Sequence, residues 1–208
     1  FAVMFPDLEA VKEYVSVSPK EEELLLSPAR PIVLLNKLKD FYKGVCGDSR
    51  YIGAMLPSNP LQAMLCESLG AIVMTSGNIS GEPIITGNEQ MLQIFENSDF
   101  LDGVLYHDRD IITSLDDSIY YVLDGKSHIV RRGRGVAPAS IPVNLGEKTV
   151  FAAGSDLKAC LGFYKNGKAV LSQHFGDLED DGCAEVYKDS AKHISSIFGF
   201  KPDITVSD

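Results

Sequence analysis

The chain has 208 residues, 45% of them hydrophobic, and carries a formal net charge of −10. This length and apolar content predict a globular protein with a sizeable core, in one large domain or two small ones. The acidic balance argues against a general binder of nucleic-acid backbones, because such binding depends on many Lys and Arg side chains. An anionic ligand is therefore expected only at a local site.

Cysteine spacing and hydropathy argue against a zinc- or disulfide-stabilised protein and against a membrane-spanning one. Cys46, Cys66, Cys160 and Cys183 form no Cys-x-x-Cys pair, so neither a zinc knuckle nor a disulfide framework is predicted, and free thiols favour a cytoplasmic location. No apolar run approaches the roughly 20 residues of a membrane span, and no basic-then-apolar leader pattern is found. Because Phe1 is not an initiator residue, we expect a piece of a longer protein.

The N-terminal third alternates apolar runs with capped helices. Ser18, Pro19 and Glu21 stand in the order that starts a helix, namely a cap, a first-turn proline and a first-turn acid. The pattern predicts strands at residues 1–5, 32–35 and 51–56, helices at 7–15, 18–27 and 57–69, and an exposed loop at 37–49. The last helix is expected to end at Gly70 and to bury an apolar face formed by Leu61, Met64, Leu65 and Leu69.

Residues 71–81 form an apolar run that changes abruptly into small polar residues and glycines. The run predicts a buried strand that ends in a loop. Thr75, Ser76, Asn78 and Ser80 are compact hydrogen-bonding residues, and such a loop can present them to a phosphate or a ribose. The alternative is a turn in which these side chains satisfy only their own backbone.

The rest of the chain predicts a mixed domain followed by a second unit. Residues 89–97 are expected to form a helix, 100–106 and 114–122 strands, and 127–131 a strand that pairs back across Asp124-Gly125. This α+β domain should end near Gly135, and 136–148 is expected to be a linker. Strands at 150–153 and 203–206, a hairpin around Asn166-Gly167 and a helix at 184–198 are typical of the start of an actin-like half-domain.

One dense basic cluster interrupts the acidic chain, in the sequence Arg131-Arg132-Gly133-Arg134-Gly135. Guanidinium groups around glycines are suited to bidentate binding of a polyphosphate. The alternative is a solvated exit from the hairpin.

Three other groups of residues are weaker candidates for binding a metal ion or phosphate, or for catalysis. Ser114 with Asp116 and Asp117 offers a hydroxyl and carboxylates for Mg²⁺, although acidic turn residues often only cap or solvate. Ser155 and Lys158 lie at a strand-to-hairpin turn of the kind that binds phosphate. His174 is a candidate general base or metal ligand, or a packed histidine. No nucleophile with a base partner is readable, so the catalytic residues stay unknown.

Several of these pieces occur together in one family. The chain closely resembles the HypF carbamoyltransferases of [NiFe] hydrogenase maturation, and the likeness covers nearly the whole chain. The segments that carry it are Pro57-Ser58-Asn59-Pro60-Leu61, Met74-Thr75-Ser76-Gly77-Asn78-Ile79-Ser80, Ser114-Leu115-Asp116-Asp117-Ser118, Arg131-Arg132-Gly133-Arg134-Gly135 and Leu171-Ser172-Gln173-His174-Phe175-Gly176-Asp177-Leu178-Glu179.

The resemblance implies a fold and an activity. It implies a YrdC-like mixed-sheet domain at residues 1–140, a linker at 141–148 and the beginning of an actin-like, Kae-like α/β domain at 149–208. Such proteins form carbamoyl-adenylate from ATP and carbamate, the latter derived from carbamoyl phosphate, and pass the carbamoyl group to the C-terminal cysteine of HypE. The resemblance makes ATP and Mg²⁺ the expected ligands, with no membrane and no nucleic acid as partner.

Site residues are carried over by position. Ser76 and Asn78 match the Ser-x-Asn pair that contacts nucleotide phosphates, Ser80 and Ser114 match neighbouring hydroxyl contacts, and Arg131 or Arg132 matches the arginine after the hairpin. The zinc and Kae-like metal sites of the longer family members are expected outside this chain, so that the fragment by itself is expected to be an incomplete catalyst. Alternatives are a threonylcarbamoyl-adenylate synthase of tRNA modification, an antibiotic O-carbamoyltransferase, in which the two domains occur in reversed order, and a non-catalytic RNA-binding module.

Overall fold

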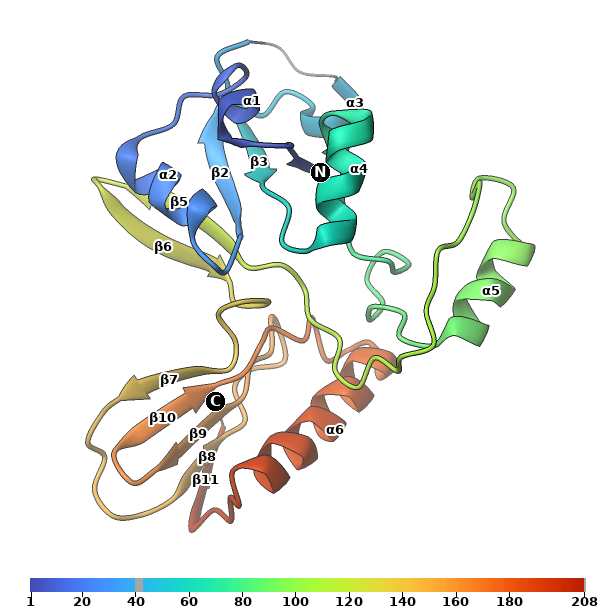
Figure 1. Ribbon diagram of the computed structural model, residues 1–208. Coiled ribbons are helices and arrows are strands. Elements are labelled where there is room, and N and C mark those ends of the chain that lie inside the picture. Colours follow the sequence, from blue (N-terminus) through green and yellow to red (C-terminus); the bar gives the residue numbers. More distant parts are fainter. Residues whose placement is uncertain (40–42, 208) are drawn as a thin grey trace. The chain divides into compact units, whose positions relative to one another are not determined.

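The structure, a computed structural model, describes residues 1–39 and 43–207 and divides into two compact units (Figure 1). The first unit contains Phe1–Ser76 and Asp117–Pro138, and the second contains Gly77–Asp116 and Ala139–Asp208. Each unit is therefore built from two separate stretches of chain. Within the described residues no helix has the length and apolar character to cross a membrane.

The first unit is a six-stranded mixed sheet in the order β4-β1-β3-β2-β5-β6. β1 is parallel to β3 and β2 to β5, whereas β1–β4, β2–β3 and β5–β6 are antiparallel. Its strands are β1 (Ala2–Met4), β2 (Ile32–Asn36), β3 (Tyr51–Met55), β4 (Ile72–Val73), β5 (Ile119–Leu123) and β6 (Lys126–Arg131), and its helices are α1 (Leu8–Lys12), α2 (Pro19–Leu26), α3 (Lys43–Cys46) and α4 (Pro60–Leu69).

The central strands are buried on both faces because neighbouring residues point in opposite directions. Val3 packs with Val11 of α1 and Leu25 of α2, whereas the next residue, Met4, packs with Cys66 of α4. This arrangement explains why these strands appear in the sequence as unbroken apolar runs. The predicted capping box of α2 is confirmed, since Ser18 and Glu21 bond each other's backbone N–H groups.

Three local predictions for this unit were wrong. β4 is an edge strand rather than a buried one, with Val73 48% exposed. On α4 the predicted apolar face points to solvent, because Cys66 is the residue that meets the sheet; Leu61, Met64 and Leu69 are 49%, 63% and 67% exposed. The predicted loop at 37–49 contains the short helix α3, and residues 40–42 lie outside the described part of the chain.

The second unit has a five-stranded sheet in the order β11-β8-β9-β10-β7, and α6 packs on it (Figure 1). Only β8 and β11 are parallel neighbours. Its elements are α5 (Asn88–Glu96), β7 (Ala139–Pro142), β8 (Val150–Ala152), β9 (Gly162–Lys165), β10 (Lys168–Leu171), α6 (Asp181–Ile197) and β11 (Ile204–Val206).

Aromatic side chains form much of the core of this unit. Phe163 meets Phe200 edge to face with ring centroids 5.0 Å apart, and Phe175 meets Tyr187 of α6 in the same way at 5.6 Å. Such pairs contribute about 0.5–1.5 kcal/mol beyond their buried area. They hold α6 against the sheet, and Ile194 completes the contact. Phe198, expected on this face, is 45% exposed.

Two further predictions failed in the second unit and one was confirmed. Residues 100–106 form no strand, and Phe100 and Leu105 are 84% and 79% exposed. The predicted linker contains β7, which pairs with β10. The Asn166-Gly167 hairpin is confirmed, since both residues have the positive φ values, 51° and 77°, that favour this turn. The α+β class predicted from the sequence is confirmed in both units.

Candidate functional site

The basic corner after β6 is held in place by Asp117. Asp117 Oδ1 accepts a hydrogen bond from Arg134 Nε at 2.8 Å and forms an ion pair with Nη2 of the same guanidinium at 2.7 Å. The same guanidinium donates to the backbone carbonyls of Ala29 and Arg30, at 3.2 and 3.0 Å. Three hydrogen bonds and an ion pair to one half-buried group make Arg134 a structural residue, because a guanidinium so engaged has little capacity left for a ligand.

The buried side chain of Ser118 also holds the backbone of this corner in place. Its fully buried hydroxyl accepts from the N–H of Gly133 at 2.9 Å and donates to the carbonyl of Arg134 at 3.0 Å. Arg131 donates from Nε to the carbonyl of Asp117 at 3.2 Å. The sequence interpretation missed Ser118, although a hydroxyl between an acidic pair and a strand is a pattern that could have indicated it.

Thr75 and Ser76 lie far from this corner along the sheet. They follow β4 and are exposed, whereas Arg131 ends β6, and β4 and β6 are the two edge strands. Five strand spacings of ~4.8 Å separate the edges by about 24 Å along the sheet. These predicted site residues therefore stand at opposite edge strands of the first unit, and their contact with one ligand stays a prediction.

Asn78 organises its own turn in the second unit. Its side-chain N–H₂ donates to the carbonyl of Ile79 at 2.9 Å and to that of Glu82 at 3.0 Å. The N–H of Ile85 donates to the carbonyl of Gly77 at 3.0 Å and closes the larger loop, while Ser80 is exposed. The amide nitrogen thus satisfies the local backbone, which was the alternative left open for this residue.

This turn forms one wall of a small pocket within the second unit. The pocket has a volume of ≈ 170 Å³. His174 contributes a ring whose Nδ1 accepts from the N–H of Gly176 at 3.2 Å, and Gln173 donates to the carbonyl of Ser114 at 3.4 Å. The polar side chains that line the pocket belong to Asn78, Glu82, Ser114, Asp116, His174 and Cys183. It therefore brings together Asn78, Ser114, Asp116 and His174, four residues singled out from the sequence.

Cys183 in this pocket is not an activated thiol. Burial raises the pKa of its thiol, and the nearby carboxylates of Asp180 and Asp177 raise it further. Its Sγ donates to the carbonyl of Gly81 at 3.8 Å. A thiol with a raised pKa stays protonated at neutral pH and is a poor nucleophile.

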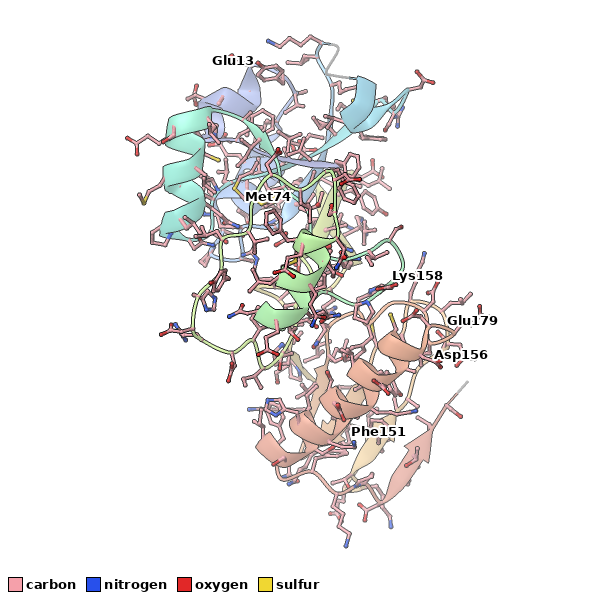
Figure 2. The ribbon with its side chains drawn as sticks, turned by 90° about the vertical axis from the view of Figure 1, so that its right-hand side faces the viewer. Glu13, Met74, Phe151, Asp156, Lys158 and Glu179 are labelled. Carbon is pink, nitrogen blue, oxygen red and sulfur yellow. The ribbon has the colours of Figure 1, made fainter. Side chains whose placement is uncertain are left out.

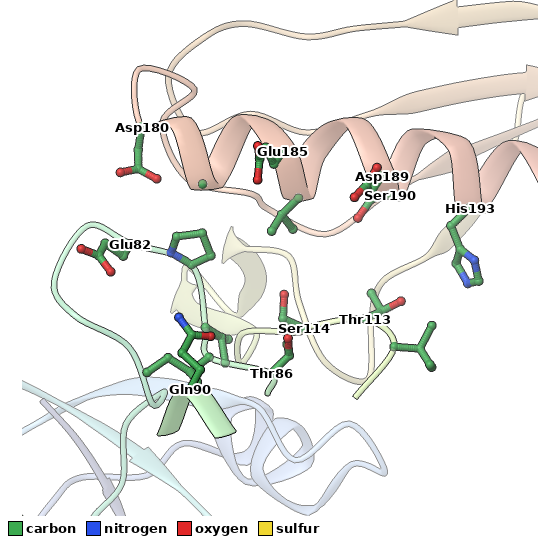
Figure 3. A pocket seen from close by; sticks show the side chains of 16 residues that line it. Glu82, Thr86, Gln90, Thr113, Ser114, Asp180, Glu185, Asp189, Ser190 and His193 are labelled. Carbon is green, nitrogen blue, oxygen red and sulfur yellow. The ribbon is translucent and has the colours of Figure 1, made fainter. Parts of the chain in front are cut away.

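A larger pocket adjoins the small one and shares Glu82, Pro83 and Ser114 with it. Its volume is ≈ 520 Å³. Figure 3 shows Glu185 and Asp189 of α6, with the N-cap residue Asp180, along one wall, opposite the segments that carry Glu82 and Ser114. No Lys or Arg is among the residues that line it, so this pocket is anionic.

The loop after β8 also lines a pocket, with a volume of ≈ 340 Å³. Ser155 is among its lining residues, and its hydroxyl donates to the carbonyl of Leu157 at 3.0 Å. Lys158 uses its backbone N–H to bond the Asp177 carboxylate at 2.8 Å. Figure 2 shows Asp156, Lys158 and Glu179 near the same end of α6. Lys158 is not among the lining residues.

The two carboxylates predicted as Mg²⁺ ligands, Asp116 and Asp117, lie in different surroundings. No group of three His, Cys, Asp or Glu residues able to hold a metal occurs in the described part of the chain. Mg²⁺ commonly needs only one or two protein carboxylates, because substrate phosphates and water supply the rest. Asp117 is engaged by Arg134, whereas Asp116 lines the small pocket.

Comparisons with known proteins cover the whole chain. Residues 1–133 match the Sua5/yciO/yrdC family, described as telomere recombination, and residues 146–208 match the HypF Kae1-like domain. A carbamoyltransferase HypF from Synechocystis is 35% identical over 211 residues, which is 100% of this chain and 27% of that protein.

Two solved structures share the fold over the full chain. Full-length HypF in the phosphate- and nucleotide-bound form has a TM-score of 0.93 at 39% identity, and this chain covers 33% of it. HypF from T. kodakarensis has a TM-score of 0.93 at 33% identity, with 27% of that chain covered. The chain thus spans about a quarter to a third of the length of these relatives. It belongs to the Sua5/yciO/yrdC family over its first 133 residues and corresponds, as a whole, to the segment of HypF carbamoyltransferases in which a YrdC-like domain is followed by the start of a Kae1-like domain.

Proposed function

We propose that the protein forms carbamoyl-adenylate and pyrophosphate from ATP and carbamate, the latter supplied from carbamoyl phosphate, and transfers the carbamoyl group to the C-terminal cysteine of HypE. The observation that carries this proposal is the uninterrupted match of the whole chain to named carbamoyltransferases, with the two domain types in the same order. The nucleotide in the solved HypF relative supports ATP as a substrate.

In this proposal the chain binds and orients ATP rather than supplying a nucleophile. Adenylation needs stabilisation of the negative charge on the triphosphate and on the departing pyrophosphate. Arg131 and Arg132 supply positive charge at a corner that Asp117, Ser118 and Arg134 make rigid. Preorganised cations cost little reorganisation when they meet the phosphates, which is the main physical advantage of such a corner.

Further contacts are assigned to residues in both units. The further nucleotide contacts proposed from the resemblance are Thr75, Ser76, Asn78, Ser80 and Ser114. Asp116 or Asp117 would hold Mg²⁺, which would supply positive charge to the triphosphate. The YrdC-like domain is proposed to span residues 1 to about 140, and the Kae-like domain to begin at residue 149. Ser155 and Lys158 are proposed to form a second phosphate-binding loop in the Kae-like domain.

The experiment is a pyrophosphate-release assay on the full-length protein with ATP, Mg²⁺ and carbamoyl phosphate. Arg132→Gln should lower kcat/KM by about 100-fold, since it removes one cation from the phosphates. Arg109→Gln, at an exposed position in the second unit, is the matched control and should behave as wild type. Wild-type turnover with threonine plus bicarbonate, but not with carbamoyl phosphate, would contradict the proposal.

A further inference from the structure

Within the second unit, a hydrogen bond joins two stretches of chain that match different family models. Gln173 lies in the stretch 146–208, which matches the HypF Kae1-like domain, and Ser114 lies in the stretch 1–133, which matches the Sua5/yciO/yrdC family. Gln173 is only 6% exposed, and its Nε2 donates to the carbonyl oxygen of Ser114 at 3.4 Å. A buried amide of the Kae1-like stretch therefore contacts the backbone of a residue that is proposed to touch the nucleotide.

The backbone at Gln173 is itself held by buried hydrogen bonds. The hydroxyl of Ser172, which is fully buried, accepts from the N–H of Leu161 and donates to the carbonyl of Gln173, both at 2.8 Å. The N–H of Phe175 donates to the carbonyl of Ala159 at 2.9 Å and continues this pairing beyond Gln173. Satisfied buried networks of this kind make the segment that forms them rigid. Gln173 thus starts from a fixed backbone, which a residue needs in order to position another.

Two further contacts join the same stretches near the start of α6. Cys183 Sγ donates to the carbonyl of Gly81 at 3.8 Å. The ring of Pro83 lies against Gly182, where a Cβ would come within 3.1 Å of two ring atoms. With the bond described above, these contacts hold the stretch 77–116 near both of its ends. Loss of one bond should therefore shift a local part of this stretch without detaching it.

We propose that Gln173 is a positioning residue for nucleotide binding, because its bond to the Ser114 carbonyl sets where the Ser114 hydroxyl meets ATP. The inference rests on the proposed function, in which Ser114 contacts the nucleotide, and it makes adenylation depend on a residue of the Kae1-like stretch. A side chain that only places a binding group contributes equally to the bound substrate and to the transition state. Its loss therefore raises KM and leaves kcat unchanged.

The test measures pyrophosphate release by the full-length protein, with ATP and carbamoyl phosphate varied in turn. Gln173→Met keeps the length of the side chain but removes the N–H₂ donor, and Gln173→Glu keeps its shape but offers only acceptors when ionised. Each variant should raise KM for ATP by about 3- to 10-fold, which is the contribution of one hydrogen bond. KM for carbamoyl phosphate and kcat should stay near wild type. An unchanged KM for ATP, or an equal rise in both KM values, would overturn the proposal.

A variant elsewhere in the same unit separates positioning from stability. The Tyr164 hydroxyl donates to the carbonyl of Gly146 at 2.8 Å and accepts from the N–H of Leu145 at 3.0 Å. Tyr164→Phe removes both bonds, so it should lower the midpoint of thermal unfolding and leave KM for ATP unchanged. If it raises KM for ATP as Gln173→Met does, KM follows the stability of the unit and the proposal is wrong.

Binding of α,β-methylene-ATP, in which the bridge between the first two phosphates is not cleaved, separates this inference from the proposed function. Calorimetry on the full-length protein should give a dissociation constant that rises by about 3- to 10-fold in Gln173→Met, as KM for ATP does. Equal dissociation constants for wild type and variant, or no binding by the wild type, would overturn the positioning role. Absence of pyrophosphate release by the wild type overturns the proposed function instead, and the positioning role is then decided by the dissociation constants.

Discussion

The two units place opposite charges at their candidate sites. In the first unit, Arg131, Arg132 and Arg134 gather at one corner, and Arg134 there is bonded to Asp117. In the second unit, the two adjoining pockets are lined by carboxylates, amides and hydroxyls without a Lys or Arg. The comparison teaches that an acidic protein can concentrate its positive charge at one corner while the pockets elsewhere in the chain are lined by carboxylates.

The units also differ in how their sites are held. The corner of the first unit is stabilised by charge-assisted hydrogen bonds, which are about twice as strong as neutral ones. The small pocket of the second unit is formed by a turn, a loop and the N-terminal part of α6, and Cys183 of α6 donates to the carbonyl of Gly81 in the turn. We therefore expect mutations at the corner to lower the free energy of unfolding of the first unit.

The largest effect on stability is expected at Gly135. Its φ is +79°, and a Cβ there would lie 2.6 Å from the Cα of Ala29, so that backbone must move. Gly135→Ala should destabilise the protein by about 2–4 kcal/mol, through the clash and the backbone strain. Urea unfolding of the full-length protein measures the change, and hydrogen exchange shows whether it is confined to the first unit.

The matched control is Gly125→Ala on the β5–β6 turn. Gly125 also has a positive φ, of +72°, but a Cβ there meets nothing within 4 Å. The free energy of unfolding of this variant should therefore fall by only about 1 kcal/mol, which is the cost of the backbone conformation alone. If Gly135→Ala and Gly125→Ala lower the free energy of unfolding equally, the close approach of Gly135 to Ala29 does not contribute to the destabilisation.

A smaller effect is expected from Arg134→Lys. Lysine keeps the charge but cannot reproduce the forked contact with Asp117 and the two backbone carbonyls. Because the pair is partly exposed, with side chains 29% and 24% accessible, the expected loss is about 1–2 kcal/mol. Thermal unfolding provides the measurement. The double variant with Asp117→Asn should lose less than the sum of the single losses, and strict additivity would contradict the pairing.

The smallest effect concerns the second unit and pH. Backbone and side-chain hydrogen bonds from Thr149 lower the pKa of Asp203 below its usual 3.8. A carboxyl group with a lowered folded-state pKa contributes stability above its unfolded pKa and loses it as the pH falls through the folded value. Thermal stability should therefore decline below about pH 4. The decline should be shallower in Asp203→Asn, and identical profiles would exclude a contribution from Asp203.

Local sequence signals predicted local structure well. The cap at Ser18, the proline at the first turn of α4 and the Asn166-Gly167 turn each specify backbone geometry within a few residues, and all three appear as expected. The failures at Phe100–Tyr106 and on α4 have a different origin. An apolar run shows that burial is favourable, but it does not show whether another element lies there to cover it.

Some features of the candidate site were likewise predicted from the sequence, and others were not. The sequence identified the candidate motifs and their order, namely the loop at residues 75–80, the corner at 131–135 and His174. The sequence could not show that Asp117 bonds to Arg134, or that Thr75 and Arg131 belong to opposite edge strands of a sheet, because strand order is set by long-range pairing.

The sequence alone determined the caps, the turns, the charge balance and the succession of motifs, since each depends on neighbours within a few positions. Only the tertiary structure decided which of these motifs meet. Asn78, Ser114 and His174 are distant in the chain, and they line one pocket because the chain stretch 77–116 packs with the C-terminal stretch rather than with the sheet that precedes it. Burial and pairing of distant segments, which no short window of sequence contains, determined that choice.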